Sequence, residues 1–168
     1  MSKKLCTITK DEIPALAKEL LEELRARDSQ SLGYQVTKLE TVGHATVLGF
    51  RGELGAGKTT LTQAIARELC ITEHVTSPTF ILERVYKIDP LSHCLQISNF
   101  SFHHLIHIDA YRIDSESELL QLGWAELVAE PTNLIIVEWP ERIASAMPVD
   151  TLYVDCKHVD ELKREISW

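Results

Sequence analysis

The chain has 168 residues, 45% of them apolar, which is the size and composition of one globular domain over residues 1–168. Its formal net charge of −8 excludes a general attraction to nucleic acid, so any role on RNA is expected to be indirect, through a partner. It has no apolar run of membrane-spanning length, its basic N-terminus lacks the apolar core of a signal peptide, and its scattered cysteines (Cys6, Cys70, Cys94 and Cys156) favour reduced thiols in a cytoplasm over a zinc site or a disulfide framework.

The first predicted element is an amphipathic helix over residues 8–27. Its apolar side chains recur at helical spacing, at Ile13, Leu16, Ala17, Leu20, Leu21 and Leu24. Thr9 and Glu12 have the spacing of a capping box, which favours a start at Thr9. Pro14 favours a later start with Asp11 as the N-cap, because proline is tolerated in the first turn of a helix. The sequence leaves both starts open.

Two segments carry no clear period. Residues 28–44 are polar and predict a loop with a short edge strand at 34–39, and residues 89–104 predict a β-hairpin with an irregular tip. Three histidines lie at or just after the end of the second segment: His103, His104 and His107. No carboxylate or cysteine pattern accompanies them, so ordinary strand histidines are favoured over metal ligands.

The strongest motif is the glycine loop Gly52–Thr60 (GELGAGKTT), which fits G-x-x-x-x-G-K-[ST]. Glycines allow the backbone to curl so that successive N–H groups surround phosphate oxygens. Lys58 is expected to reach the β- and γ-phosphates, and the Thr59 hydroxyl to bind Mg²⁺. A strand at 45–50 precedes the loop and a helix ending near Cys70 follows it, which is the order that the motif requires. The predicted phosphate-binding residues are Leu54, Gly55, Ala56, Gly57, Lys58, Thr59 and Thr60.

A segment held extended by Pro78 follows the loop helix and carries two hydroxyl side chains, Ser77 and Thr79. Nucleotide hydrolases often place a switch segment here that contacts the γ-phosphate or its Mg²⁺. An ordinary connection between a helix and a strand explains the same pattern. A strand over residues 80–86 is expected next.

Two apolar strands each end in an acid. The first, over residues 105–109, ends at Asp109, and the second, over residues 134–138, ends at Glu138. Their continuous apolar runs predict strands that are covered on both faces. Phosphate chemistry needs one group that holds Mg²⁺ and another that orients the attacking water. The sequence pattern does not assign these two roles between the two acids.

The remaining elements complete an α/β domain. A capping box at Ser115 predicts a helix over residues 115–129, which Gly123 weakens or breaks. Residues 151–156 predict a last apolar strand, and residues 157–168 a turn and a short antiparallel strand. The expected fold is a P-loop NTPase-like three-layer sandwich: a mostly parallel sheet with helices on both faces and an antiparallel portion toward the end of the chain.

Four motifs occur in the order of one family: Gly52–Thr60, Ser77–Phe80, His107–Arg112 (HIDAYR) and Glu138–Glu141 (EWPE). In this combination the chain resembles the bacterial TsaE (YjeE-type) ATPases, over roughly residues 8–156. The resemblance implies a protein that binds ATP and Mg²⁺, hydrolyses ATP slowly and docks on the TsaD–TsaB pair. That pair would modify the adenosine beside the anticodon of tRNA with a threonylcarbamoyl group, and this chain would contact tRNA only through its partners.

The resemblance also implies roles for single residues. Thr59 and Glu138 match positions linked to Mg²⁺, and Asp109 matches an acid needed for hydrolysis. Trp139 matches a position near the nucleotide and the partner surface, and Glu12 a position near the adenine. The expected catalytic residues are Asp109, Glu138 and Lys58. The expected switch and partner residues are Ser77, Thr79, Tyr111 and Arg112.

Two other functions fit parts of the pattern. A small-molecule kinase carries the same loop, but it needs an acceptor site and usually an arginine-bearing lid. Arg112 and Arg142 lie near the motifs without forming an arginine-rich segment. A nucleotide-dependent interaction module with negligible hydrolysis is the third interpretation. Residues 28–44 and 89–104 are also longer than the usual connections of the resembled family.

Overall fold

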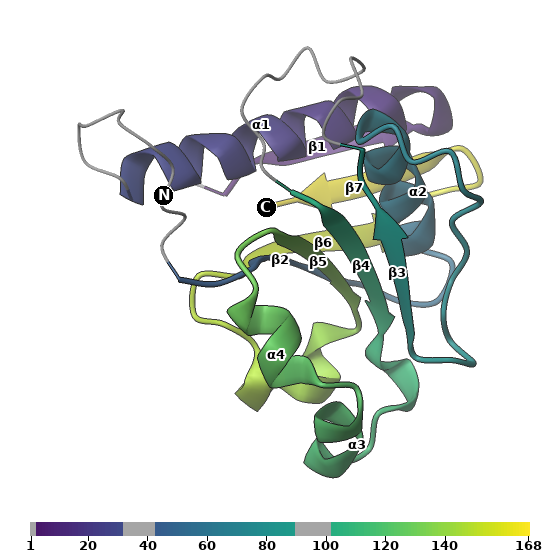
Figure 1. Cartoon of the computed structure of the whole chain (residues 1–168). Helices are drawn as coiled ribbons and strands as arrows, with labels where there is room; N and C mark the ends of the chain where they lie inside the picture. Colours follow the sequence, from purple (N-terminus) through teal and green to yellow (C-terminus); the bar gives the residue numbers. More distant parts are fainter. Residues whose placement is uncertain (1–2, 32–42, 90–101) are drawn as a thin grey trace.

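The computed structural model of the chain describes residues 3–31, 43–89 and 102–168, and within these ranges seven strands form one sheet (Figure 1). The strands are β1 (Leu5–Thr9), β2 (Thr46–Arg51), β3 (Glu83–Lys87), β4 (His104–Asp109), β5 (Asn133–Glu138), β6 (Leu152–His158) and β7 (Lys163–Ser167). The α-helices are α1 (Ile13–Ser31), α2 (Lys58–Glu68), α3 (Glu116–Gln121) and α4 (Trp124–Ala129). Short 3₁₀-helices are η1 (Lys10–Glu12), η2 (Ala110–Arg112) and η3 (Pro140–Ala146). Over the same ranges, no helix combines the length and apolarity needed to cross a membrane.

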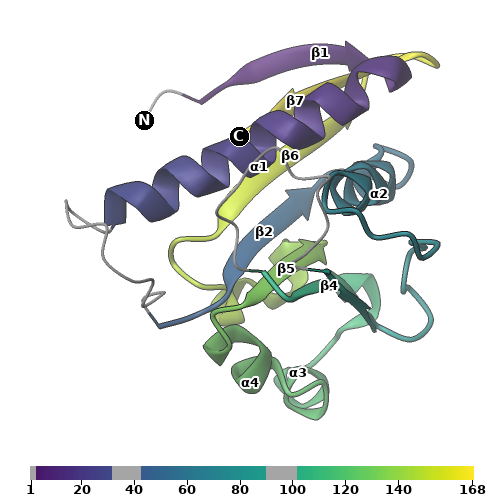
Figure 2. The same ribbon diagram turned by 45° about the horizontal axis from the view of Figure 1, so that its top comes forward.

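The centre of the sheet is parallel and its edges are antiparallel. Strands β6, β2, β5 and β4 lie side by side with parallel pairing. At one edge β7 and β1 add antiparallel pairs, and at the other edge β3 runs antiparallel to β4. Helices α1 and α2 cover one face and α3 and α4 the other (Figures 1 and 2). The predicted α/β sandwich is therefore confirmed, with antiparallel pairing at both edges instead of only toward the end of the chain.

The buried strand β5 shows how the fold aims the site residues. All six of its residues are buried. Leu134 and Ile136 belong to the apolar cluster under α1 and α2, whereas Ile135 and Val137 belong to the cluster under α3 and α4. Because side chains alternate along a strand, Glu138 points to the same face as Ile136, which is the face of α2. Two-sided burial also explains why the apolar run shows no alternation in the sequence.

The N-terminal region departs from the prediction of one helix over residues 8–27. Residues 5–9 form β1, which pairs with β7, and α1 begins only at Ile13. The Thr9 N–H and hydroxyl both donate to Glu12 Oε2 at 2.8 Å, so the predicted capping pair closes the 3₁₀ turn ahead of α1. Pro14 then lies in the first turn of α1, as the later start requires. The strand was missed because its partner comes from the far end of the chain.

Other element boundaries differ in a way that single residues explain. Strand β3 begins at Glu83 instead of residue 80, because Leu82 has a φ of 64° that interrupts the extended backbone. The predicted helix over residues 115–129 is divided into α3 and α4 at Gly123, whose φ is 67°. The edge strand predicted at 34–39 and the tip of the predicted hairpin fall on residues 32–42 and 90–101, which lie outside the described residues.

The cysteines differ from one another. Of those in the described ranges, Cys6 and Cys156 are free thiols, whereas Cys70 is disulfide-bonded. The prediction of reduced thiols is therefore wrong for Cys70, because spacing along a chain does not show which thiols a fold brings together. Cys94 lies outside the described residues. Burial raises the pKa of the Cys156 thiol to about 12, so this side chain contributes packing and not reactivity.

Candidate functional site

The glycine loop between β2 and α2 has the shape that an anion cradle needs. Gly52, Gly55 and Gly57 have φ values of 134°, 79° and 101°, a region that side chains disfavour. A Cβ at Gly52 would lie 2.1 Å from the Cys156 carbonyl oxygen of β6, whereas a Cβ at Gly55 would meet open space. Helix α2 begins directly after the loop, at Lys58, so its N-terminal N–H groups and the positive end of its dipole lie at the loop. The loop therefore fits a phosphate group.

Lys58 is buried at this loop, with 4% of its surface exposed. Its Nζ donates to the carbonyl oxygens of Gly52 and Glu53 at 2.7 and 3.0 Å. Burial lowers the pKa of Lys58, and the nearby Glu138 carboxylate acts in the opposite direction. Phosphate oxygens would be stronger acceptors for this ammonium than the two carbonyls are. The lysine is thus placed to exchange loop contacts for ligand contacts.

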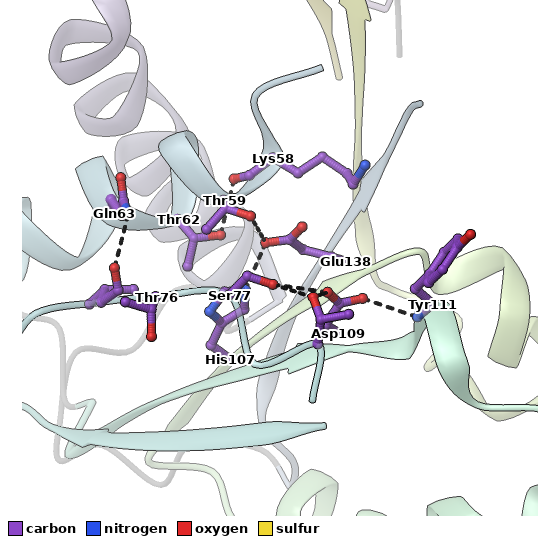
Figure 3. A network of polar contacts seen from close by, with 12 residues as sticks. Lys58, Thr59, Thr62, Gln63, Thr76, Ser77, His107, Asp109, Tyr111 and Glu138 are labelled. Carbon is purple, nitrogen blue, oxygen red and sulfur yellow. Dashed lines mark hydrogen bonds and ion pairs between the residues drawn. The ribbon is translucent and has the colours of Figure 1, made fainter. Parts of the chain in front are cut away.

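Glu138 stands at the end of β5 and joins three elements (Figure 3). Its Oε1 accepts a hydrogen bond from Thr59 Oγ1 of α2 at 2.8 Å and contacts His107 Nε2 of β4 at 2.8 Å. The structure thus brings together the two residues that were predicted to hold Mg²⁺. A hydroxyl and a carboxylate are the hard oxygen donors that Mg²⁺ prefers, and this ion needs few protein ligands because it keeps several waters. The donor set fits the ion.

Asp109 stands beside Glu138, at the end of β4, and has different partners. The two residues are register neighbours in the parallel pair β4–β5. Asp109 Oδ2 accepts hydrogen bonds from the hydroxyls of Ser77, at 3.0 Å, and Thr79, while Oδ1 accepts from the Tyr111 N–H at 3.1 Å. The Ser77 and Thr79 hydroxyls also contact each other at 2.6 Å. The segment that was predicted as a switch is therefore bound to the carboxylate that was predicted to serve hydrolysis (Figure 3).

The same segment is tied at its beginning to two regular elements. Gln63 Nε2 of α2 donates to the Val75 carbonyl at 2.9 Å. The Thr76 N–H donates to the hydroxyl of Tyr86 on β3 at 3.4 Å. Because Gln63 lies one turn after Thr59, α2 contacts both the loop site and the switch segment.

An aromatic pair covers the outer side of the site. Trp139 has a φ of 59°, which is rare for a bulky residue and aims its ring back over the loop. The ring centroid lies 4.0 Å from Lys58 Nζ and 5.1 Å from the ring of Tyr111. Arg112 lies 4.6 Å over the ring of Phe80, a side chain that is 84% exposed. Tyr111 and Arg112 are thus exposed beside the switch segment, and their role toward a partner stays a prediction.

Some predicted residues are not drawn into the site. Glu12 is exposed, its carboxylate receives both Thr9 bonds, and within the described residues no hydrogen bond or ion pair joins it to the glycine loop. Its role near an adenine stays a prediction. Leu54 is 92% exposed at the tip of the loop, and Thr60 is exposed on α2. These two residues can contribute backbone N–H groups, but within the described residues no side-chain hydrogen bond joins them to Asp109 or Glu138.

The sequence reasoning missed three residues that the fold places here. His107 was interpreted as an ordinary strand histidine, yet it contacts Glu138. Its position two residues before Asp109 on a strand was the available signal, because that spacing puts both side chains on one face. Gln63 had no signal beyond its helical position. Arg164 of β7 lies beside the loop, with its Cγ 4.0 Å from the place that a Cβ on Gly57 would take.

Several known proteins with similar sequences carry the same description. Residues 9–166 match the profile of the family "Threonylcarbamoyl adenosine biosynthesis protein TsaE". A tRNA threonylcarbamoyladenosine biosynthesis protein TsaE from Treponema pallidum is 34% identical over 142 residues, which is 84% of this chain and 93% of that protein. The TsaE protein of Bacillus subtilis is 35% identical over 122 residues, 73% of this chain and 68% of that one. The crystal structure of Bacillus subtilis YdiB superimposes with a TM-score of 0.64 at 26% identity, covering 99% of this chain and 84% of that one.

Proposed function

The chain belongs to the TsaE family, which functions in tRNA threonylcarbamoyladenosine biosynthesis, and we propose that it does so as a magnesium-dependent ATPase. The observation that carries this proposal is the meeting of Thr59, Glu138 and Asp109 at the open glycine loop. A loop without these acids would bind a phosphate group but would offer no carboxylate to hold a metal or to orient water.

The geometry supports a division of roles between the two acids. Glu138 shares a hydrogen bond with Thr59, the residue that the motif assigns to Mg²⁺, and is therefore the acid on the metal side. Bound there, Mg²⁺ would neutralise charge on the β- and γ-phosphates. Asp109 is bound to the switch hydroxyls and is therefore the acid that orients the attacking water once those hydroxyls release it. This assignment goes beyond what the sequence pattern allowed.

Lys58 and the loop supply the binding of the triphosphate. Lys58 would move its Nζ from the carbonyls of Gly52 and Glu53 to phosphate oxygens. Trp139 lies over the same ammonium and would shield it from water, which strengthens its electrostatic interactions. Ser77 and Thr79 would then be free to contact the γ-phosphate or the waters of the metal.

We further propose that hydrolysis serves the TsaD–TsaB pair in the cytoplasm and that tRNA is contacted only through these partners. The net charge of −8 supports the indirect role, since a polyanion would be repelled by most of this surface. The kinase alternative loses support, because Arg112 and Arg142 contact Phe80 and Asp114 instead of the loop. Arg142 also lies over the ring of Tyr111, and within the described residues no hydrogen bond or ion pair joins either arginine to the glycine loop.

The test is a measurement of ATP binding and phosphate release with and without Mg²⁺ and TsaD–TsaB. We expect Mg²⁺-dependent release of inorganic phosphate that the partners stimulate, and loss of tight ATP binding in Lys58→Ala. Unchanged ATP affinity in Lys58→Ala would contradict the site assignment. Transfer of the γ-phosphoryl group to a small acceptor would favour a kinase, and partner binding without turnover would favour an interaction module.

A further inference from the structure

We infer that His107 is a positioning residue for the proposed ATPase: it fixes the Glu138 carboxylate so that one of its oxygens remains available to the metal site. The inference rests on the proposed function, because it concerns how Glu138 is presented to Mg²⁺. It assigns a role to the histidine of the HIDAYR element, which the motif pattern left as a strand residue.

The first observation is the direction of the histidine ring. His107 is fully buried in the middle of β4 and is the register partner of Ile136, not of Glu138. Its ring reaches forward along β5 by two residues, about 6.6 Å of strand, to place Nε2 at 2.8 Å from Glu138 Oε1. The ring thus leans toward the carboxyl ends of the strands, where the glycine loop and α2 begin (Figure 3).

The second observation is the way the two bonds share one oxygen. An ionised carboxylate can only accept hydrogen bonds, so the proton of the His107–Glu138 contact belongs to Nε2. The Thr59 hydroxyl donates to the same atom, Oε1, at 2.8 Å. In the described part of the chain both bonds reach Oε1 and none is found on Oε2. Within the described residues, the two donors therefore bind Oε1 of the carboxylate and leave Oε2 available to the metal site.

The Glu138 carboxylate needs hydrogen bonds to keep a defined orientation. The last torsion of a glutamate side chain has a broad, roughly two-fold energy profile, so a carboxylate keeps a defined plane only when contacts hold it. Thr59 is half-buried and is itself the predicted metal ligand. Of the two hydrogen bonds to Glu138, the one from Thr59 is therefore the one that metal binding would change. His107 lies on a central strand, is 0% exposed and has no such second duty. Of the two donors to Glu138, His107 is therefore the one whose hydrogen bond would persist when a metal binds.

The free nitrogen of the ring supports a dedicated role. His107 Nδ1 is buried and has no hydrogen-bond partner among the described residues. An unpaired buried polar atom destabilises the folded state, so packing alone would favour an apolar side chain here. The polar contact that the histidine supplies here is the bond from Nε2 to Glu138, and groups that orient metal ligands in other sites make bonds of this kind.

The experiment compares three substitutions at this position with one control histidine. In His107→Gln an amide N–H takes the place of the Nε2 donor, in His107→Asn the amide is one methylene shorter and falls short of Glu138, and His107→Leu has no donor. His104→Leu changes another histidine of β4, at the opposite end of the strand from Asp109, and within the described residues no hydrogen bond joins its side chain to Asp109 or Glu138. Each protein is assayed with TsaD–TsaB for Mg²⁺-dependent turnover. Mn²⁺ is then titrated into each ATP complex and followed by electron paramagnetic resonance of the free ion, and thermal unfolding is recorded.

We expect His107→Leu and His107→Asn to weaken Mn²⁺ affinity and turnover by about 10- to 100-fold, the range seen for residues that orient metal ligands. His107→Gln is expected to restore both quantities to within about threefold of the original protein, and ATP affinity measured in EDTA should change less than about threefold in every variant. If His107→Leu does not fold, the difference between the Gln and Asn variants decides the question, because both are polar and close in size.

The possible results separate this inference from the proposed function. Mn²⁺ affinity and turnover at the original level in His107→Leu would overturn the inference alone, and so would equal losses in the Gln and Asn variants, since only the shape of the ring would then matter. Losses of the same size in His104→Leu would show a general effect on β4 and would also overturn it. Absence of ATP binding and turnover in the unsubstituted protein would overturn the proposed function, and the inference with it.

Discussion

The two strand-end acids lie side by side and are equally buried, yet they are held by different kinds of structure. Glu138 is 3% exposed and Asp109 4%. The partners of Glu138 come from regular elements, Thr59 from α2 and His107 from β4. The side-chain partners of Asp109 are Ser77 and Thr79, which belong to an irregular segment between α2 and β3. Regular elements thus hold the Glu138 carboxylate, whereas a short irregular segment holds the Asp109 carboxylate.

With these partners, one edge of a sheet can separate two chemical roles. Contacts between packed helices and strands open only with large parts of the fold, whereas a short segment can open locally at low free energy. A metal ligand benefits from a fixed position, and a group that acts only during turnover benefits from being released by ligand binding. The predictions below test whether the two carboxylates really differ in this way, beginning with the largest effect.

Removing the charge of Glu138 should damage metal binding and turnover together. In Glu138→Gln the amide keeps the size of the side chain but removes a hard anionic ligand, and metal stabilisation of phosphate charge amounts to several kcal/mol. We expect turnover to fall by about 1,000-fold and the Mn²⁺ affinity of the ATP complex to fall in parallel. Turnover and Mn²⁺ titration measure the two quantities, and full Mn²⁺ affinity in this variant would move Glu138 away from the metal side.

Removing the charge of Asp109 should separate the same two quantities. Asp109→Asn retains the shape and can still accept the Tyr111 N–H, but it is a poor base toward water. We expect turnover to fall by about 100-fold while Mn²⁺ and ATP affinities stay within about threefold of the original values. The same titrations provide the measurement. A parallel loss of Mn²⁺ affinity would show that both acids hold the metal and would remove the contrast between them.

Much of this arrangement could be predicted from the sequence, because it follows from local rules. The glycine loop is defined by spacing, and the acids follow apolar runs that predict parallel strands, whose carboxyl ends meet at one edge of a sheet. The structure joins Thr59 and Glu138 by a hydrogen bond, and their predicted role toward Mg²⁺ stays a prediction. The two roles of the acids could not be assigned, because the difference lies in their partners and not in their own sequence context.

The features that could not be predicted from the sequence share one physical cause, because each depends on contacts between distant parts of the chain. Strand β1 forms because it pairs with β7, whose residues lie about as far away in sequence as the chain allows. The contact of His107 with Glu138 depends on the direction in which the ring leans along its strand; the spacing of the sequence shows only that His107 shares a face with Asp109. The disulfide of Cys70 likewise depends on what the fold brings near it.

Weakening the contact between the switch segment and Asp109 should free that segment without changing the scaffold. In a Ser77→Ala, Thr79→Val variant both hydroxyl donors are lost, while the ties from Gln63 and Tyr86 remain. Hydrogen bonds to charged groups contribute about 1.5–3 kcal/mol, so amide exchange over the segment should become about tenfold faster or more.

Hydrogen exchange read by mass spectrometry on peptides that cover residues 75–82 measures this change, and peptides of α2 and β5 should show no difference. Thr72→Val, at an exposed threonine just after α2, is the control for replacing a hydroxyl by a methyl group. Unaltered exchange over residues 75–82 in the double variant would mean that other contacts hold the segment, and that Asp109 is no more releasable than Glu138.

The smallest effect concerns a third carboxylate near the same edge, Glu83 on β3, which lacks the partners that the other two have. Its Oε2 is buried without a hydrogen-bond partner among the described residues, and burial raises the pKa of Glu83. The folded protein therefore holds this proton more tightly than the unfolded chain does. The stability that Glu83 contributes is fully present below its unfolded pKa and is lost as the pH rises through its raised folded pKa.

Glu83→Gln should consequently raise the midpoint of thermal unfolding by about 1–2 °C at pH 7. The gain should disappear near pH 4, where the protonated Glu83 side chain of the original protein is neutral like the glutamine that replaces it. Glu73→Gln, at an exposed position, is the matched control for the loss of one negative charge from a chain with a net charge of −8. Unfolding scans of the three proteins at both pH values measure the effect. An equal gain from both substitutions at pH 7 would mean that the gain comes from reduced charge repulsion in general. A gain confined to Glu83→Gln would show that a carboxylate buried without hydrogen-bond donors destabilises this edge, in contrast to Glu138 and Asp109, which accept hydrogen bonds.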